Sequence, residues 1–400
     1  MPSFILTDVA HDLWVEDFAI TPTGLGLAAT HPWSVTKRVL HGGRREGVEL
    51  IVVDNGALSF SIIPTRGMGL WKGHFRGDRI GWDSPITDGP VNPAFVNLMS
   101  TGGLGWLEGF DELLARAGLE HNGAPYEVKT ENPDGSASHT TYGLHGKIAN
   151  IPARYVAVHV GEDPPHEITI EGHVDEARLF APHIRMITRI TTTPGSNRVV
   201  VRDEFVNLKE TPSELEILYH WNFGPPLLEE GSRFVAPIQT LVPRNKDAQE
   251  AIGHYDVYRG PEPGGPEQVF FLELHARPDD GRTLAMLRNH AGDKGVVLRF
   301  AKAQLPVFSL WKRTGGLREG YVTGLEPATN YPNPKPFEKA RNRVVSLAEG
   351  VGYVVETTLE IVATRSEVAA VEEEVEALQA QGAPRVHEKP VDPFATAAGA

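Results

Sequence analysis

The sequence predicts an all-β fold: one large antiparallel β-sandwich domain followed by a C-terminal helix. Its 400 residues include 41 glycines and 31 prolines, which lie between short apolar runs rather than in one block. That distribution is typical of a chain with many short strands and tight turns. With 40% hydrophobic residues the chain can bury a large core, and it shows no internal repeat and no linker. We therefore expect a single β domain over residues 1–364.

The first regular strands are expected after residue 48. Residues 1–48 mix polar and apolar positions without a clean period, and we interpret them as an N-terminal cover on the core. Residues 49–54 form an apolar run that ends at an Asn55-Gly56 turn signal. Apolar and small side chains then alternate with a period of two over residues 57–62, which indicates a half-buried strand.

Residues 86–141 are less regular. Glycines beside Trp106 and Phe110 favour a loop folded across a surface, and residues 113–119 are expected to form one helical turn. Residues 131–141 are polar and contain the sequence Asn-Pro-Asp-Gly, which predicts an exposed loop.

The strongest strand patterning begins near residue 167. Apolar runs, several of which alternate with polar residues, are separated by turn residues at the spacing of a sandwich. The expected strands are residues 167–174, 183–193, 198–207, 214–221, 268–275, 283–288, 295–300, 305–311, 344–349 and 351–362.

The all-β pattern stops near Thr364. Valines and a leucine then recur at helical spacing between glutamates, which predicts a C-terminal helix within residues 365–382. The apolar stripe of this helix is narrow and could dock on its own domain or on a partner chain, so a homodimer is one expectation. Residues 383–400 are small and polar, and we expect a disordered tail there.

Composition excludes several classes of function. A net charge of −14 without a basic block argues against a nucleic-acid partner. Without cysteine the chain has no disulfide, no Cys-ligated zinc and no thiol nucleophile, which is compatible with a reducing cytoplasm. The N-terminus lacks a signal-peptide pattern, and no run reaches the ~18 apolar residues of a membrane span. We expect a cytoplasmic protein without a membrane partner. No His-x-His pair occurs among its 16 histidines, so no metal site is expected.

A single carboxylate stands out in residues 321–334. Glu326 lies where a predicted strand ends, and Pro327 after it disfavours a helical conformation. The asparagines, tyrosine and prolines that follow predict a rigid turn. A carboxylate held in a fixed position is what a general base requires.

Two histidines and one arginine are further candidates. His220 closes a predicted strand among aromatic residues, and it is either a structural histidine at their rim or a general acid. His145 precedes Gly146, which leaves space beside the ring, and it is either a turn histidine or part of a site. Arg66 is either a surface arginine or a fork of donors that points into a cleft.

The order of His145, His220 and Glu326 resembles that of the aldose 1-epimerase (galactose mutarotase) superfamily. Leu-His-Gly at residues 144–146 and Tyr-His-Trp-Asn-Phe at residues 219–223 are similar to the two histidine segments of that family. Glu-Pro-Ala-Thr-Asn from residue 326 is similar to the segment of its catalytic glutamate. The likeness spans residues 45–362. Residues 80–85, 105–112 and 324–333 are most similar to an aldose epimerase-like branch.

The resemblance implies a galactose mutarotase-like supersandwich that interconverts the anomers of a free sugar without a metal or cofactor. Glu326 would take the proton of the anomeric hydroxyl, His220 would protonate the ring oxygen, and His145 would hydrogen-bond the ring oxygen or a neighbouring hydroxyl and help to hold charge. Lys147 replaces a second family glycine, and the aspartate of galactose-specific members has no counterpart, so the sugar is left open. Further sugar contacts are expected from Arg66, Trp106, Asp111, Glu112, Trp311 and Asn330, although Asp111 and Glu112 could equally be solvated loop charges.

Two other classes of function stay open. A non-catalytic carbohydrate-binding protein on the same scaffold would need the aromatic and polar groups but not the His/Glu pair. A lyase or glycosidase is the other alternative, and a lyase would be expected to use a Tyr or Lys base such as Tyr142 or Lys312.

Overall fold

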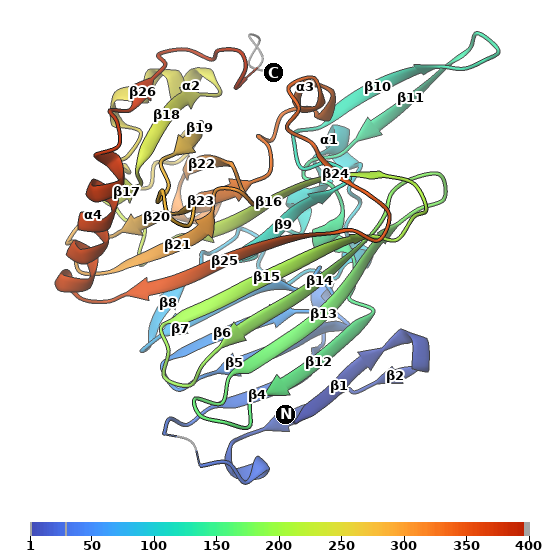
Figure 1. Ribbon diagram of the computed structural model, residues 1–400, viewed down its shortest axis with the longest axis vertical. Coiled ribbons are helices and arrows are strands. Elements are labelled where there is room, and N and C mark those ends of the chain that lie inside the picture. The colour runs from blue at the N-terminus through green and yellow to red at the C-terminus, as the bar shows by residue number, and fades with distance from the viewer. Residues whose placement is uncertain (1, 29, 396–400) are drawn as a thin grey trace.

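The computed structural model describes residues 2–28 and 30–395 and confirms a β fold built from two large sheets that are antiparallel almost throughout (Figure 1). Within these residues one sheet has ten strands, in the spatial order β17, β20, β21, β25, β15, β14, β13, β12, β1 and β2. Their bounds are β1 (Ser3–Asp8), β2 (Leu13–Trp14), β12 (Tyr155–Val160), β13 (Ile168–Ala177), β14 (His183–Thr192), β15 (Arg198–Asn207), β17 (Arg233–Val235), β20 (Arg282–Arg288), β21 (Gly295–Ala301) and β25 (Gly352–Val362).

The other sheet has fourteen strands over the same part of the chain. Twelve follow the order β26, β18, β19, β22, β23, β16, β9, β7, β6, β5, β4 and β3, while β24 pairs with β16 and β8 with β7. Their bounds are β3 (Phe18–Ile20), β4 (Ser34–Leu40), β5 (Val48–Asp54), β6 (Leu58–Ile63), β7 (Gly69–Phe75), β8 (Asp78–Ile80), β9 (Leu114–Leu119), β16 (Ser213–Phe223), β18 (Ile238–Pro243), β19 (Glu267–Leu274), β22 (Val307–Thr314), β23 (Tyr321–Ala328), β24 (Val345–Leu347) and β26 (Arg385–Val386).

The main core lies between the two sheets. In β14 and β15 every second side chain is buried, as the alternation in the sequence predicts. The apolar side chains among them join one cluster with residues of the other sheet, including Ile51 and Tyr219. A two-stranded hairpin, β10 (Tyr126–Glu131) and β11 (Ala137–Tyr142), projects from this body (Figure 1).

The C-terminal helix α4 (Arg365–Gln379) docks on its own domain. Thr364 caps its N-terminus by accepting a hydrogen bond from the Glu367 N–H. Its apolar stripe of Val368, Val371, Val375 and Leu378 packs against Leu284, Met286, Val297 and Val362 of the ten-stranded sheet. The other α-helical segments are α1 (Ser100–Gly103), α2 (Lys246–Glu250) and α3 (Lys335–Lys339), and the 3-10 turns are η1 (Val9–His11), η2 (Thr23–Leu25), η3 (Gly43–Arg45), η4 (Pro93–Phe95), η5 (Gly105–Glu108), η6 (Ile148–Asn150), η7 (Ile252–His254) and η8 (Leu317–Glu319).

Three expectations about local structure are wrong. Residues 1–48 do not merely cover the core, because they supply edge strands to both sheets. Residues 113–119 contain β9 rather than a helical turn; this strand is buried on both faces, so its sequence shows no alternation. Residues 131–141 lie largely in the exposed β10–β11 hairpin, where cross-strand hydrogen bonds order a polar segment.

The predicted disorder of residues 383–400 is wrong for the part that the structure describes. β26 pairs in parallel with β18, and Asn333 donates a hydrogen bond to the Phe394 carbonyl. Phe394 also packs against Tyr331. This segment is ordered by pairing and burial that its composition does not reveal. Residues 396–400 lie outside the described residues.

Candidate active site

A cavity of about 360 Å³ lies on the face of the fourteen-stranded sheet that points away from the inter-sheet core. It brings together all three residues that the sequence predicts as catalytic, together with Trp106 and Trp311. The lining consists of Leu104, Trp106, Leu107, Phe110, Ala124, Pro125, Leu144, His145, His220, Arg244, Glu267, Val269, Trp311, Glu326 and Pro332.

The alternation of β16 and β23 directs the catalytic candidates into this cavity. In β16, Tyr219 and Trp221 belong to the inter-sheet core, so His220 between them points to the opposite face. In β23, Leu325 lies in the same core, and Glu326 points away from it. Both strands are buried almost throughout because one face is covered by the core and the other by the loops around the cavity.

The register of these two strands sets His220 opposite Glu326. β16 and β23 run antiparallel, and Trp221 pairs with Leu325 while Leu218 pairs with Ala328. Opposed residues on one face lie close together, and His220 Nε2 is 3.2 Å from Glu326 Oε1. Neither side chain is more than 5% exposed, so the pair is shielded from bulk water.

Hydrogen bonds around Asn222 determine which nitrogen of His220 carries the proton. The Asn222 amide nitrogen donates to the Glu112 carbonyl at 3.0 Å and to the His220 carbonyl at 2.8 Å. Its oxygen must therefore face His220 Nδ1, 2.6 Å away, and accept a hydrogen bond from it. In the neutral ring Nδ1 is then protonated, and the lone pair of Nε2 faces Glu326.

Burial disfavours charge on both members of the pair. Burial, helped by neighbouring His145, lowers the pKa of His220 to about 3. Burial also raises the pKa of Glu326 well above its usual range, while the positive charge of Arg244 opposes that increase. Burial thus favours the uncharged form of each of these two side chains.

His145 is held by its backbone and by one carbonyl. Its φ is 58°, in the left-handed region, and Gly146 follows at 69°. A Cβ on Gly146 would lie 2.3 Å from the Gly118 carbonyl oxygen, so only glycine fits here. His145 Nδ1 donates to the Asn122 carbonyl at 2.8 Å, which leaves Nε2 as an acceptor in the neutral ring. Burial lowers the pKa of His145 to about 4.

Aromatic rings form much of the cavity wall. The rings of Trp106 and His145 meet edge to face with centroids 4.7 Å apart, and Phe110 lies 5.1 Å from His220. Trp311 lies 5.3 Å from His220, and its indole N–H donates to the Glu267 carboxylate at 2.6 Å. Such rings suit the apolar face of a sugar ring.

Four predicted sugar contacts do not line the cavity. Arg66 and Glu112 form a buried ion pair at 2.5 Å, and Asp111 accepts a hydrogen bond from the Trp71 indole at 2.6 Å. Asn330 exchanges hydrogen bonds with the amide of Asn122. Because these polar groups are bonded to protein, we interpret the four residues as structural supports. Asn330 orders the residue whose carbonyl holds His145, and Glu112 supplies the carbonyl that holds Asn222.

Three residues of the site are missed from the sequence. Arg244 directly follows β18 and Glu267 begins β19, so both reach the cavity only through the order of strands in the sheet. Gly324 lies two residues before Glu326 on the same face of β23. A Cβ there would be 2.3 Å from Glu326 Oε1 and 3.0 Å from His220 Cε1. The two-residue spacing of Gly324 and Glu326 could have indicated this glycine, because residues two apart on a strand lie on the same face.

The residues considered for a lyase lie elsewhere. Tyr142 lines a different cavity, beneath the β10–β11 hairpin, and stacks on Tyr126. Lys312 donates to the carbonyls of Tyr255 and Val257, and burial lowers its pKa to about 8. Neither side chain lines the cavity that contains His220 and Glu326.

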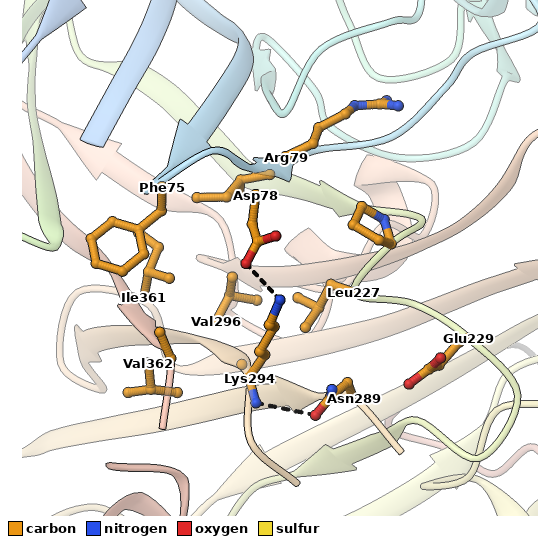
Figure 2. A pocket seen from close by; sticks show the side chains of 14 residues that line it. Phe75, Asp78, Arg79, Leu227, Glu229, Asn289, Lys294, Val296, Ile361 and Val362 are labelled. Atoms are coloured by element: carbon orange, nitrogen blue, oxygen red, sulfur yellow. Dashed lines mark hydrogen bonds and ion pairs between the residues drawn. The ribbon is translucent and has the colours of Figure 1, made fainter. Parts of the chain in front are cut away.

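In another pocket, of about 170 Å³, the charged side chains named below are already paired with one another or with a neighbouring residue (Figure 2). Its ammonium group, on Lys294, is paired with Asp78 at 2.6 Å, and Arg79 extends away from this pair and bonds Asp83. Across the described residues no group of three or more His, Asp or Glu side chains is placed to hold a metal ion. In the same residues no helix is long and apolar enough to cross a membrane.

Comparisons with known proteins show which family and which solved structures this chain resembles. The family described as Domain of unknown function (DUF4432) matches residues 45–361. A solved structure from Klebsiella pneumoniae subsp. pneumoniae, described as a "putative aldose 1-epimerase", is 36% identical with a TM-score of 0.90, over 98% of this chain and 99% of that chain. No curated protein matches the chain.

Two more distant structures share the fold alone. A galactose mutarotase-like protein from Clostridium acetobutylicum is 14% identical with a TM-score of 0.56, over 82% of this chain and 98% of that chain. A galactose mutarotase related enzyme from Lactobacillus acidophilus is 12% identical with a TM-score of 0.50, over 79% and 98%.

Proposed function

This chain belongs to the DUF4432 family, within the aldose 1-epimerase (galactose mutarotase) superfamily, and on that premise we propose that it interconverts the α and β anomers of a free sugar. The observation that carries the proposal is the 3.2 Å contact between His220 Nε2 and Glu326 Oε1 in the wall of an aromatic cavity. Ring opening needs one group that takes the proton of the anomeric hydroxyl and another that protonates the ring oxygen. The pair supplies both groups.

In this proposal His220 Nε2 and Glu326 share one exchangeable proton. With one proton shared, moving it from Glu326 to His220 gives a carboxylate next to an imidazolium. Glu326 then acts as the base and His220 as the acid, and the positive charge of Arg244 favours the carboxylate form. The Asn222 oxygen stabilises the imidazolium because it already accepts the Nδ1 proton.

The catalytic cycle returns the pair to its starting state. Glu326 takes the proton of the anomeric hydroxyl while His220 Nε2 gives its proton to the ring oxygen, and the bond between the anomeric carbon and that oxygen breaks. Rotation about the adjacent carbon–carbon bond presents the other face of the carbonyl. Reclosure returns one proton from the open-chain hydroxyl to His220 and one from Glu326 to the carbonyl oxygen.

Supporting groups complete the proposed mechanism. Glu326 Oε1 has no hydrogen-bond partner among the described residues, so a sugar hydroxyl can supply the missing donor. His145 Nε2 faces the same cavity and, in its neutral form, accepts a hydrogen bond from a sugar hydroxyl. Trp106 and Trp311 form apolar surfaces for the ring. A non-catalytic binding protein would not need the acid and base to be opposed in this way.

The experiment is anomer exchange measured by magnetisation-transfer NMR on a panel of aldoses, ketoses and acidic sugars. Wild type should accelerate exchange of at least one sugar, and Glu326→Gln and His220→Asn should each reduce the enzymatic rate by about 10²- to 10⁴-fold. Glu349→Gln, which changes an exposed glutamate, is the matched control and should keep the wild-type rate. Absence of acceleration on every sugar, or variants that match wild type, would contradict the proposal.

A further inference from the structure

Arg244 is the cationic group of the cavity, and it has no anion paired with it. Within the described part of the chain its guanidinium makes no hydrogen bond, and no carboxylate lies within ion-pair distance. Burial lowers the pKa of Arg244, and the negative charges of Glu267 and Glu326 offset only part of that effect. Glu267 is already bonded to the Trp311 indole. An arginine of this kind presents several N–H donors to whatever enters the cavity.

The position of Arg244 separates it from the acid–base pair. It follows β18, which is three strand spacings from β23, roughly 14 Å between backbones. Its backbone N–H bonds the Val269 carbonyl on β19 and fixes the start of its side chain on that wall. Arg244 therefore reaches the cavity from the β18 side, whereas the pair lies on β16 and β23. A sugar whose anomeric carbon lies at Glu326 would present a distal substituent to Arg244.

Charge favours a distal substituent with a single negative charge. A neutral sugar would displace water from the guanidinium and offer only hydroxyl groups in return, whereas a carboxylate would form two parallel charge-assisted hydrogen bonds. A phosphate brings up to two negative charges. Those charges would meet one guanidinium, with the Glu267 carboxylate also in the wall.

We propose that the sugar taken by this cavity is a hexuronic acid, whose carboxylate is bound by Arg244 while its anomeric centre meets His220 and Glu326. This inference rests on the proposed function and narrows its substrate class. Arg244 has one alternative role, because its charge also favours the carboxylate form of Glu326. That role would affect every sugar equally, whereas carboxylate binding would affect only acidic sugars.

The test compares kcat/KM for glucuronate and galacturonate with kcat/KM for glucose and galactose. Wild type should prefer the uronates by at least about tenfold, and Arg244→Gln should reduce the uronate-to-hexose ratio by about 10- to 100-fold. Arg244→Lys should retain part of the preference, since it keeps the charge but loses the planar fork. Arg38→Gln, at an exposed position on β4, should keep the wild-type ratio.

Binding measured without turnover separates this inference from the proposed function. In Glu326→Gln protein, glucuronate should bind more tightly than glucose by calorimetry, and adding Arg244→Gln should remove the difference. Equal losses for acidic and neutral sugars, no uronate preference, or a stronger preference for glucose 6-phosphate would each overturn the inference. Exchange of neutral hexoses alone would overturn it while leaving the proposed function standing. Uronate binding that depends on Arg244 but occurs without any anomer exchange would overturn the proposed function while leaving the carboxylate-binding role of Arg244 standing.

Discussion

Glu216 offers a quantitative test of the effect of burial on a carboxyl group near the site, because its carboxyl group is buried and contacts no cationic side chain among the described residues. The side chain lies on β16, four residues before His220, and is fully buried. Its Oε2 accepts a hydrogen bond from the Asn122 N–H at 3.2 Å, while Oε1 has no partner among the described residues. Burial raises the pKa of Glu216 to about 8, with Lys335 opposing the shift and Glu338 and Glu214 adding to it.

The perturbation is Glu216→Gln, which keeps the shape but cannot ionise. Between pH 4.5 and 8 the folded carboxyl stays protonated while the unfolded one ionises, so the unfolded state binds fewer protons and wild-type stability falls as pH rises. The slope is about 1.4 kcal/mol per pH unit. From pH 5 to 7.5 the free energy of unfolding of the variant should therefore gain about 3 kcal/mol relative to wild type. Above pH 8 the difference should level off.

Urea denaturation at pH 5, 6, 7, 7.5 and 9 measures this difference. A constant offset from the additional amide N–H of glutamine does not matter, because only the change with pH is tested. Glu373→Gln, on the exposed face of α4, is the matched control and should show no such change. A difference between Glu216→Gln and wild type that stays constant from pH 5 to 7.5 would refute the reasoning.

Two further predictions concern the acid–base pair. Gly324→Ala should lower the rate of anomer exchange by about 100-fold, because its Cβ would lie 2.3 Å from Glu326 Oε1 and displace the carboxyl group. Gly253→Ala, where a Cβ meets nothing within 4 Å, is the control and should keep the wild-type rate, and an unchanged rate in Gly324→Ala would contradict the proposed geometry. In ¹⁵N NMR of the ligand-free protein at pH 7, His220 should be neutral with the proton on Nδ1, because Asn222 accepts that proton and burial lowers the pKa of His220 to about 3. A proton on Nε2 alone would show that this hydrogen-bond assignment is wrong.

The sequence predicts those parts of the fold whose side chains face two different environments. Strands such as β14 and β15 alternate because one face meets the core and the other meets solvent. β9 has both faces covered, and the alanines and glycine in it are weak strand formers, so local pattern suggested a helical turn instead. β26 depends on pairing with a strand about 145 positions earlier, and no local pattern encodes such a contact.

The same distinction holds for the candidate site. Glu326, His220 and His145 could be named because each lies in a short segment with a recognisable neighbour pattern. The hydrogen bonds between Asn122 and Asn330 join residues 208 positions apart, and only the folded chain shows that they support His145. Arg244 is equally hidden, since its place on the cavity wall follows from the order of four strands in the sheet.

The two kinds of wall around the cavity differ in how readily they open. His220 and Glu326 lie on β16 and β23, each paired on both sides within the sheet and buried almost throughout. Another part of the wall consists of η5 and the residue before it, where Leu104 is 39% and Leu107 is 47% exposed. In hydrogen exchange we expect the amides of the two strands to exchange with the slowest cooperative unit, and those of η5 to exchange faster through local opening. An opening confined to this turn would widen the entrance to the cavity while the distance between acid and base stays fixed.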